Sequence, residues 1–431
     1  MQSLEVLEIR PQFRWLEGKR PEEVFNGNIF EDKKTMVPTP CYIIEERQLH
    51  ENGRILAGVA ERTGCKILLA QKAFSNYDLY PVLKEYLAGT EASGLFEARL
   101  GVEEMPGKEV HVFCGAYREE EFEELLQYAD HIVFNSIHQL KKFGKKAKDA
   151  GKSVGLRINP EHSTQEGHAI YDPCAPGSRL GVTRAVWEME MTEDLVSLLD
   201  GLHFHTLCEQ DADALETTLQ AVGERFGDVL PKMRWLNMGG GHHITKPGYD
   251  VDKLENCIRY AKETWNVEVY LEPGEAVALN AGYLVSRVLD VVMNGETKIA
   301  ILDASAACHM PDVIEMPYQP PIYGAMVCEE KAVENSHAAE RKLQETQVQY
   351  RYRLAGPTCL AGDVIGDYCF LEELKEGDLL IFGDMAIYTT CKNNTFNGMP
   401  LPDIWKRTVD GELVSLTNFE YSDFKMRLGS R

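Results

Sequence analysis

The sequence lacks several features that would assign it to a class of protein. Its 11 cysteines form no CxxC pair, so neither a zinc ribbon nor a disulfide framework is indicated. Basic residues are scarce, because 45 lysines and arginines face 68 acidic residues and the net charge is −23. This charge disfavours nucleic acid and anionic membranes as partners. It either attracts a cationic substrate or only aids solubility.

Long apolar stretches are also missing. No run approaches the length of a membrane span, and the N-terminal MQSLEVLEIRPQFRW lacks the pattern of a signal peptide. We therefore expect a cytoplasmic protein with reduced thiols. With 44% hydrophobic residues, the 431-residue chain can build a substantial core, as one large α/β domain with an appendage or as two domains.

Short apolar runs alternate with longer amphipathic stretches between residues 66 and 273. The predicted strands are KILLA (66–70), GTEAS (89–93), EVHVFCG (109–115), HIVFNS (131–136), SVGLRIN (153–159), GLHFHT (201–206), RWLNMG (234–239) and VEVYLEP (267–273). Helical patterns such as 119–129, 138–151 and 252–265 lie between them. Eight strands with intervening helices predict a (β/α)₈ TIM-like barrel. A doubly wound open sheet is the alternative, because spacing alone does not show closure.

The pattern changes after about residue 281, where β-rich runs with turn signals predominate. The early run TPCYIIE (39–45) is a further strand that precedes the barrel, so we expect a β-rich second domain built from both chain ends. The polar segment 160–180 is expected to be a long loop after the fifth strand. The predicted division is an N-terminal extension at 1–35, a β-domain strand and lead-in at 36–60, the barrel at 61–280, and the C-terminal β-domain at 281–431 with a charged excursion at 328–347.

Several residues with chemical potential fall where predicted strands end, which is where barrels carry their active sites. Lys72 follows the first strand, and a lysine that loses solvation there can form a Schiff base, although a rim lysine in water is the common alternative. Gly239, Gly240 and Gly241 follow the seventh strand. Glycines allow positive φ and bring N–H groups close to an anion, and this loop is a usual phosphate site in barrels.

Two histidines, His203 and His205, alternate on the sixth strand and point to one face. This HxH spacing also occurs in metal-dependent barrel hydrolases, where we would expect it on the first strand. A core histidine is a good alternative for His203 and a poorer one for His205. His242 and His243 follow the glycines, and we assign them a turn role.

The stretch YLEPGEAVA ends the eighth strand with Glu272 and Glu275, which frame a Pro-Gly turn. Such carboxylates can hold a metal, pair with a cationic ring nitrogen or cap a turn. Further along, Cys359 lies in the turn LAGPTCLAGD and Tyr388 in FGDMAIYTT. Each is ambiguous alone, because a random thiol and a packing tyrosine are common.

Taken in order, the lysine, the histidine, GGG, EPG, GPTC and GDMAIYT resemble the fold-type III pyridoxal phosphate (PLP) decarboxylases, relatives of alanine racemase. The resemblance covers roughly residues 37 to 405. Five longer segments are most similar in sequence to the carboxynorspermidine/carboxyspermidine decarboxylases. These segments are TPCYIIE, SGLFEARLG, HFHTLCE, EPGEAVAL and KNNTFNGMPLPDI.

This resemblance implies a role for each matched residue. Lys72 would hold PLP covalently, His205 would stack on its ring, and Glu272 would pair with the pyridine nitrogen. The three glycines would bind the phosphate through their N–H groups, and Tyr388 would add its hydroxyl. Arg179, in SRLG, resembles a family arginine near the site.

The resemblance also implies a homodimer, in which Cys359 of one subunit would reprotonate the substrate carbon in the other. Ornithine and diaminopimelate decarboxylases carry EPGR, where this chain has Glu275, and ornithine decarboxylases carry GPTCD, where it has Leu360. A carboxylate repels phosphate, so we expect Glu275 to face a cation. The substrate-binding candidates are Glu275 and Asp312, followed by Asp303.

The implied reaction is decarboxylation of carboxynorspermidine and/or carboxyspermidine in polyamine (spermidine) biosynthesis, with no metal. The alternatives are a decarboxylase of diaminopimelate or ornithine, a metal-dependent barrel hydrolase that uses the two histidines, and a non-catalytic PLP-binding protein. The β-domain with its cysteine speaks against the last of these.

Overall fold

The computed structural model of the protein describes residues 38–165, 172–327 and 350–429. The predicted extension at 1–35 and the excursion at 328–347 lie outside the described residues, as does part of the loop at 160–180. The chain divides into two compact units. One contains the described residues up to Arg47 and from Asn280 onward, and the other is Gln48–Leu279.

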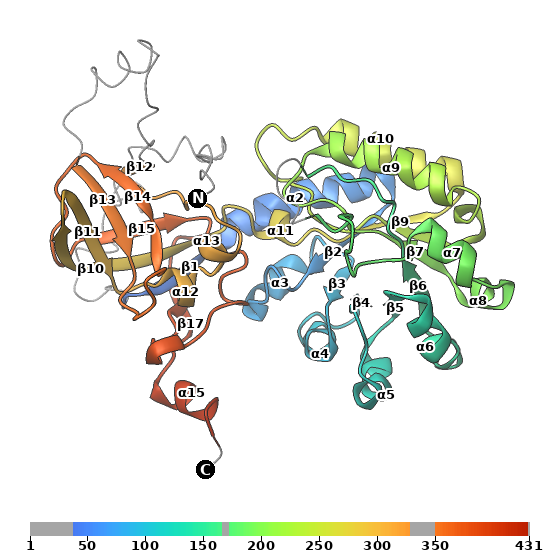
Figure 1. Ribbon diagram of the computed structural model, residues 1–431, viewed down its shortest axis with the longest axis horizontal. Coiled ribbons are helices and arrows are strands. Elements are labelled where there is room, and N and C mark those ends of the chain that lie inside the picture. The colour runs from blue at the N-terminus through green and yellow to red at the C-terminus, as the bar shows by residue number, and fades with distance from the viewer. Residues whose placement is uncertain (1–37, 166–171, 328–349, 430–431) are drawn as a thin grey trace, which may run out of the picture. The chain divides into compact units, whose positions relative to one another are not determined.

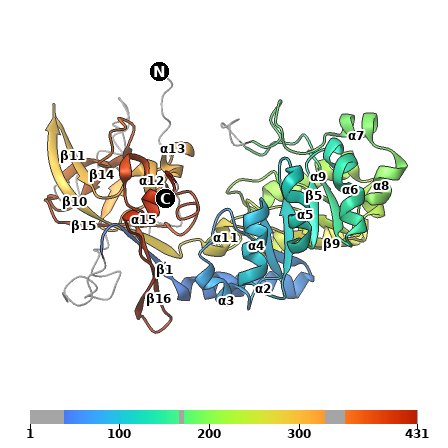
Figure 2. The same ribbon diagram turned by 90° about the horizontal axis from the view of Figure 1, so that it is seen from below.

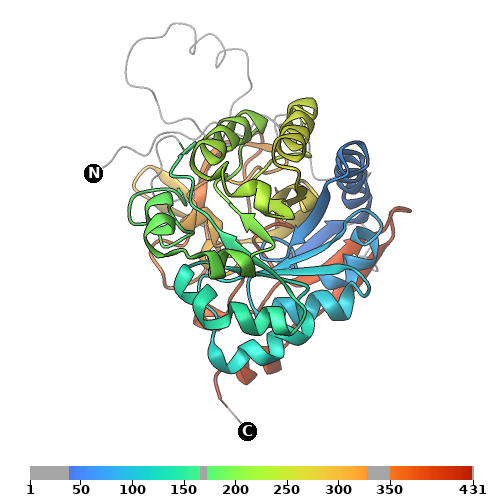
Figure 3. The same cartoon turned by 90° about the vertical axis from the view of Figure 1, so that its right-hand side faces the viewer.

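The unit Gln48–Leu279 is a closed parallel barrel, so the predicted closure is confirmed against the open sheet. Neighbouring strands pair in sequence order, and β9 returns to β2 with Lys66 opposite Tyr270. Viewed along the barrel, the strands lie at the centre with helices around them (Figure 3). The strands are β2 (Lys66–Ala70), β3 (Gly89–Ala92), β4 (Glu109–Phe113), β5 (His131–Phe134), β6 (Ser153–Arg157), β7 (Gly201–His203), β8 (Trp235–Asn237) and β9 (Glu268–Leu271).

Helices cover the outside of this barrel, and α4 and α5 run side by side there (Figure 2). Their bounds are α2 (Glu46–Thr63), α3 (Tyr80–Leu83), α4 (Leu95–Glu104), α5 (Glu119–Tyr128), α6 (Ile137–Asp149), α7 (Arg184–Glu190), α8 (Glu193–Leu198), α9 (Ala212–Phe226), α10 (Val251–Trp265) and α11 (Glu275–Ala278). Among the described residues, no helix is both long and apolar enough to cross a bilayer.

Local sequence explains why these elements form, as α10 illustrates. Its apolar residues recur every three or four positions and are buried, from Leu254 to Trp265. The Asp250 side chain accepts a hydrogen bond from the Lys253 N–H at 2.9 Å and so caps the first turn. The helix ends at Asn266, which is left-handed with φ 54°.

The second unit is a nine-stranded sheet in the order β12-β14-β13-β11-β10-β1-β16-β17, with β15 also paired to β10. Its strands are β1 (Cys41–Glu45), β10 (Gly282–Asn294), β11 (Thr297–Leu302), β12 (Ala325–Val327), β13 (Tyr350–Ala355), β14 (Val364–Phe370), β15 (Leu379–Gly383), β16 (Asp403–Arg407) and β17 (Leu413–Thr417) (Figure 1). Short helices accompany it, namely α12 (Ala306–His309), α13 (Asp312–Glu315) and α15 (Tyr421–Met426).

Strand β1 lies inside this sheet although it precedes the barrel in the chain. It pairs antiparallel with β10 and parallel with β16, and all five of its residues are buried. The prediction of a β-rich domain built from both chain ends is therefore confirmed. Cys369, in β14, is in a disulfide, so the expectation that every cysteine is a reduced thiol is wrong at this residue.

Candidate active site

The carboxyl ends of the barrel strands bring most of the predicted site residues to one rim. Lys72 follows β2, His205 follows β7, the glycines follow β8 and Glu272 follows β9. Arg179 lies in the loop after β6, exposed, where its charge is felt by the buried Arg157. Residues that are far apart in the sequence therefore lie at the same end of the barrel, because all eight strands are parallel.

Glu272 is the most constrained of these residues. Its carboxylate is 4% exposed and lies 3.1 Å from His203 Nε2 and 2.5 Å from Asn237 Nδ2. Burial alone would raise the pKa of Glu272, but His203, then His111 and Asn237, hold it below its ordinary value. The site therefore contains a buried, ionised carboxylate.

The glycine turn fits closely against its neighbours. A Cβ on Gly239 would lie 2.4 Å from Phe204 O, and one on Gly241 would lie 2.0 Å from Leu207 O. Both glycines have positive φ, 69° and 80°. The Gly239 N–H donates to Asn237 Oδ1 at 2.9 Å and the Gly240 N–H donates to His205 Nδ1 at 3.2 Å. Two of the three predicted phosphate donors therefore have side-chain acceptors here.

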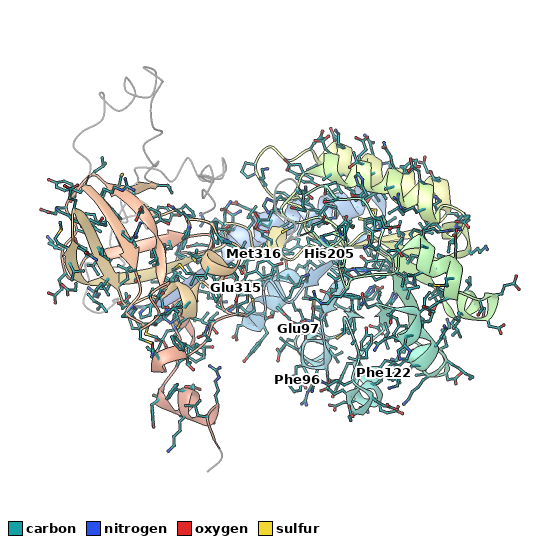
Figure 4. All side chains as sticks on the ribbon, viewed as in Figure 1. Phe96, Glu97, Phe122, His205, Glu315 and Met316 are labelled. Carbon is teal, nitrogen blue, oxygen red and sulfur yellow. The ribbon has the colours of Figure 1, made fainter. Side chains whose placement is uncertain are left out.

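The bond from Gly240 also fixes the His205 ring, which Figure 4 labels within the barrel unit. Burial, together with the charges of Lys72 and Arg157, puts the pKa of His205 well below its ordinary value. The ring is neutral, and Nδ1 is its acceptor nitrogen. A neutral imidazole in a fixed plane is suited to stacking on another ring.

Lys72 lies among charged residues that the sequence did not single out. Glu91, on β3, is 4% exposed, and burial followed by the charge of Glu272 raises the pKa of Glu91 well above its ordinary value, while Lys72 opposes this. Burial likewise raises the pKa of Glu97, again opposed by Lys72. Figure 4 labels Glu97 on α4. Lys72 thus acts on two glutamates, Glu91 and Glu97, whose pKa values are both raised.

Arg157 and His203 form a further layer beneath the rim. Arg157 donates to His205 O at 2.8 Å and lies over the Phe113 ring at 4.6 Å, and burial lowers the pKa of Arg157 to about 10. Phe113 in turn stacks with His203 at 5.3 Å. The sequence signal for Glu91, Arg157, His203 and Asn237 was a polar residue inside an otherwise apolar strand.

Glu275 is the first residue of α11 and is nearly buried. Its carboxylate lies 3.1 Å from His243 Nε2, and Glu209 completes a group whose ligand atoms all lie within 4.8 Å. We expected Glu275 to face a cation. In this structure its carboxylate faces the imidazole of His243. The sequence indicates only a turn role for His243, whose contact with Glu275 becomes visible in the structure.

The predicted histidine pair does not have the geometry of a metal site. His203 Nε2 is directed at Glu272, whereas His205 Nδ1 accepts the Gly240 N–H. Within the described parts of the chain, the groups with metal-ligand spacing are Glu109–His111–His131 and Glu209–His243–Glu275, and neither includes the pair. The barrel hydrolase alternative is thus not supported by the arrangement.

The remaining predicted residues belong to the β-domain. Cys359 is exposed in the turn between β13 and β14, and its N–H donates to Asn397 Oδ1 at 2.8 Å. Tyr388 follows β15 in a left-handed conformation, with φ 51°. Asp303 accepts bonds from Ser286 Oγ (2.7 Å) and the Arg287 N–H (2.8 Å), and Asp312 is ion-paired with Lys392. Both of these carboxylates have partners within their own unit.

Comparisons with known proteins agree with this arrangement. Residues 41–386 match the family model described as "Pyridoxal-dependent decarboxylase, C-terminal sheet domain". The chain is 43% identical over 391 residues to the carboxynorspermidine/carboxyspermidine decarboxylase of Campylobacter jejuni, covering 91% of this chain and 98% of that protein. It is 39% identical over 407 residues to the carboxyaminopropylagmatine decarboxylase of a Synechocystis species, covering 94% and 99%.

A solved structure of carboxynorspermidine decarboxylase from Campylobacter jejuni, complexed with norspermidine, has the same fold. It superposes with a TM-score of 0.79 at 41% sequence identity and covers 91% of this chain and 100% of the other. The likeness therefore extends over both units rather than over the barrel alone.

Proposed function

From the premise that this chain belongs to the pyridoxal-dependent decarboxylases, which work with pyridoxal phosphate, we propose that it removes the α-carboxylate of carboxynorspermidine, carboxyspermidine or both. The products would be norspermidine or spermidine and CO₂. The observation that carries this proposal is the 43% identity over 91% of the chain to a decarboxylase with that name.

The barrel residues fit the cofactor in their donor set. Lys72 supplies a primary amine, Glu272 a buried carboxylate, and His205 a neutral ring held in one plane. The turn at Gly239 and Gly241 lies so close to the backbone of Phe204 and Leu207 that only glycine fits, and glycine-rich turns of this kind can bind phosphate. A buried carboxylate beside a lysine and a glycine turn is the combination that a cationic ring with a phosphate needs.

We assign the cofactor contacts accordingly. Lys72 Nζ would bind the cofactor covalently, and Tyr388, the glycine turn and Arg179 would contact its phosphate or its rim. Glu272 would hold a proton on the ring nitrogen, and His205 would keep the ring in position. When bound, the cofactor supplies a sink for the electron pair released as the Cα–carboxylate bond breaks. Cys359 would deliver a proton to Cα after CO₂ leaves.

We place the substrate's distal ammonium groups at the acidic residues of the rim. Glu275 and Glu209 offer carboxylates within 4.8 Å of one another around His243, whereas Asp312 is held by Lys392 and Asp303 by the backbone of β10. Glu275→Gln would therefore raise the KM for a polyamine substrate more than Asp303→Asn would. Equal KM values for the two variants would contradict this assignment.

We also propose a homodimer with shared active sites, in the cytoplasm. If Lys72 and Cys359 act from different subunits, a mixture of inactive Lys72→Ala and Cys359→Ala proteins would regain about a quarter of wild-type activity, because half of random dimers are mixed and each has one intact site. No recovery after subunit exchange, checked by tagged pull-down, would contradict shared sites.

The function is tested by an absorbance spectrum of the purified protein followed by CO₂ release. The expected result is a visible cofactor band that Lys72→Ala alters, and the fastest release from carboxynorspermidine or carboxyspermidine. A band that survives Lys72→Ala unchanged would refute the covalent role of that lysine. Faster release from diaminopimelate or ornithine would favour the alternatives.

One further substrate belongs in that panel. The 39% identity to a carboxyaminopropylagmatine decarboxylase over 94% of the chain supports carboxyaminopropylagmatine as a second candidate. That compound ends in a guanidinium group, which binds carboxylates bidentately. A higher kcat/KM for it than for both carboxylated polyamines would move the proposal to this substrate.

A further inference from the structure

Both histidines of the HFH stretch lie at the candidate active site, but the proposed function uses only His205, which would hold the cofactor ring. We propose that His203 and Asn237 are positioning residues that act through Glu272, fixing the direction and the negative charge of its carboxylate. This inference rests on the proposed function, because it concerns the residue assigned to the cofactor's ring nitrogen.

The contacts leave Glu272 little freedom. His203, from β7, meets Oε2 at 3.1 Å, and Asn237, from β8, meets Oε1 at 2.5 Å. His203 is 1% exposed and Asn237 is fully buried. The two oxygens accept hydrogen bonds from residues on different strands, so rotation of the carboxylate would break at least one of these bonds. A fixed carboxylate can present its remaining lone pairs in only one direction.

The state of His203 follows from its two ring nitrogens. Nε2 faces Glu272, whereas Nδ1 is buried and has no hydrogen-bond partner among the described residues. A second proton on the ring would leave the Nδ1–H buried without an acceptor, which is costly. His203 is therefore a neutral donor, and the proton stays on the imidazole while the charge stays on Glu272. Burial correspondingly lowers the pKa of His203.

Asn237 links the two ends of the cofactor site. Its Nδ2 donates to Glu272, while its Oδ1 accepts the Gly239 N–H at 2.9 Å. One amide thus connects Glu272, which is proposed to pair with the ring nitrogen, to the glycine turn, which is proposed to contact the phosphate. Replacement by aspartate would turn the donor into a second carboxylate and repel Glu272.

Other charges also act on Glu272 and would contribute to its titration. Glu91 on β3, His111 on β4 and Arg157 on β6 act on Glu272, and Lys72 after β2 acts on His203. Among the described residues around the carboxylate, His203 and Asn237 hydrogen-bond to it. These two residues are therefore the ones whose removal should change its direction.

The test compares His203→Leu and Asn237→Ala with His131→Gln, which changes a barrel histidine at the opposite end of the strands. We expect the acidic limb of the kcat/KM pH profile to move up by about one unit in the first two variants, because Glu272 loses a donor to its charged form. The KM should change little while kcat falls about tenfold. His131→Gln should leave the profile in place.

A second readout does not depend on turnover. Pyridoxal phosphate affinity of the apo-protein, measured by quenching of tryptophan fluorescence, should fall about tenfold in His203→Leu and should be unchanged by the same substitution in a Glu272→Gln background. Equal losses in both backgrounds would overturn the inference, since His203 would then act without Glu272. If Glu272→Gln itself alters neither affinity nor the spectrum, the proposed role of Glu272 fails instead.

Discussion

Single buried amides hold the loops of the barrel rim in place, and Asn52 is the clearest example. This residue of α2 is 1% exposed, and its Nδ2 donates to Val277 O at 3.1 Å and to Leu279 O at 2.9 Å. Those carbonyls close the short helix α11, whose first residue is Glu275. The amide thus supports the segment that carries both glutamates of EPGE.

Replacing Asn52 by leucine should destabilise the barrel unit by about 3 kcal/mol, because two buried carbonyls lose their donor. Urea unfolding followed by tryptophan fluorescence measures the change in the free energy of unfolding. Glu51→Ala, at an exposed position on the same helix, should stay within about 0.5 kcal/mol of wild type. A similar effect of both changes would contradict the role of the amide.

The first residues of several barrel strands form a polar layer at the end of the barrel opposite the candidate active site. Lys66 on β2 bonds to Glu109 on β4 at 2.6 Å, and His111 stacks on His131 of β5 at 3.8 Å. Burial opposes ionisation of Glu109, yet hydrogen bonds from His111 and Lys66 lower the pKa of Glu109 to about 2. Burial and the neighbouring His111 lower the pKa of His131 to about 3.

The His131 shift predicts a loss of stability in acid. The unfolded chain binds a proton on this residue below about pH 6.5, whereas the folded chain does so only near pH 3, so stability falls as the pH drops through this window. The loss from this residue should reach about 2 kcal/mol by pH 5. His131→Gln should flatten the dependence of unfolding free energy on pH between 7 and 5, and the exposed His138→Gln should not.

The turn that carries Cys359 is held by a buried carboxylate. Asp363, 2% exposed, accepts bonds from Thr358 Oγ1 at 2.7 Å and from Ser305 Oγ at 2.9 Å. Asp363→Ala should loosen the turn and destabilise the β-domain by about 3 kcal/mol, because buried hydroxyls lose a charged acceptor. Alkylation of Cys359, followed by mass spectrometry, should speed up several-fold, while the exposed Asp410→Ala should leave the rate unchanged.

The strands of the two units differ in how well the sequence predicts them. The eight barrel strands were predicted because each is a short apolar run between helical patterns, and their bounds agree within two or three residues. In the β-domain, β12, β14, β16 and β17 were not predicted, because β12 has only three residues and polar residues interrupt the apolar ones in the other three. The partners of Glu272 could not be predicted, because they depend on the register among β7, β8 and β9.

The protein's excess of negative charge should affect how fast charged ligands associate with it. With a net charge of −23, the protein attracts polyamine cations over distances that salt screens, about 10 Å at 0.1 M. The kcat/KM for a carboxylated polyamine should therefore fall several-fold between low and 0.3 M salt, measured by CO₂ release. The association rate of the anionic cofactor with the apo-protein should rise over the same range of salt. If kcat/KM and the cofactor association rate instead fall equally, the net charge does not steer these ligands by electrostatic attraction and repulsion.

The position of β1 inside the sheet has a consequence for synthesis on the ribosome. This strand is complete at Glu45, but its antiparallel partner begins at Gly282 and its parallel partner at Asp403. At roughly 5–20 residues per second, the five buried residues of CYIIE wait roughly 10 to 70 seconds for those partners. The nascent chain can complete its barrel in that time, so the second unit forms only when translation is nearly finished.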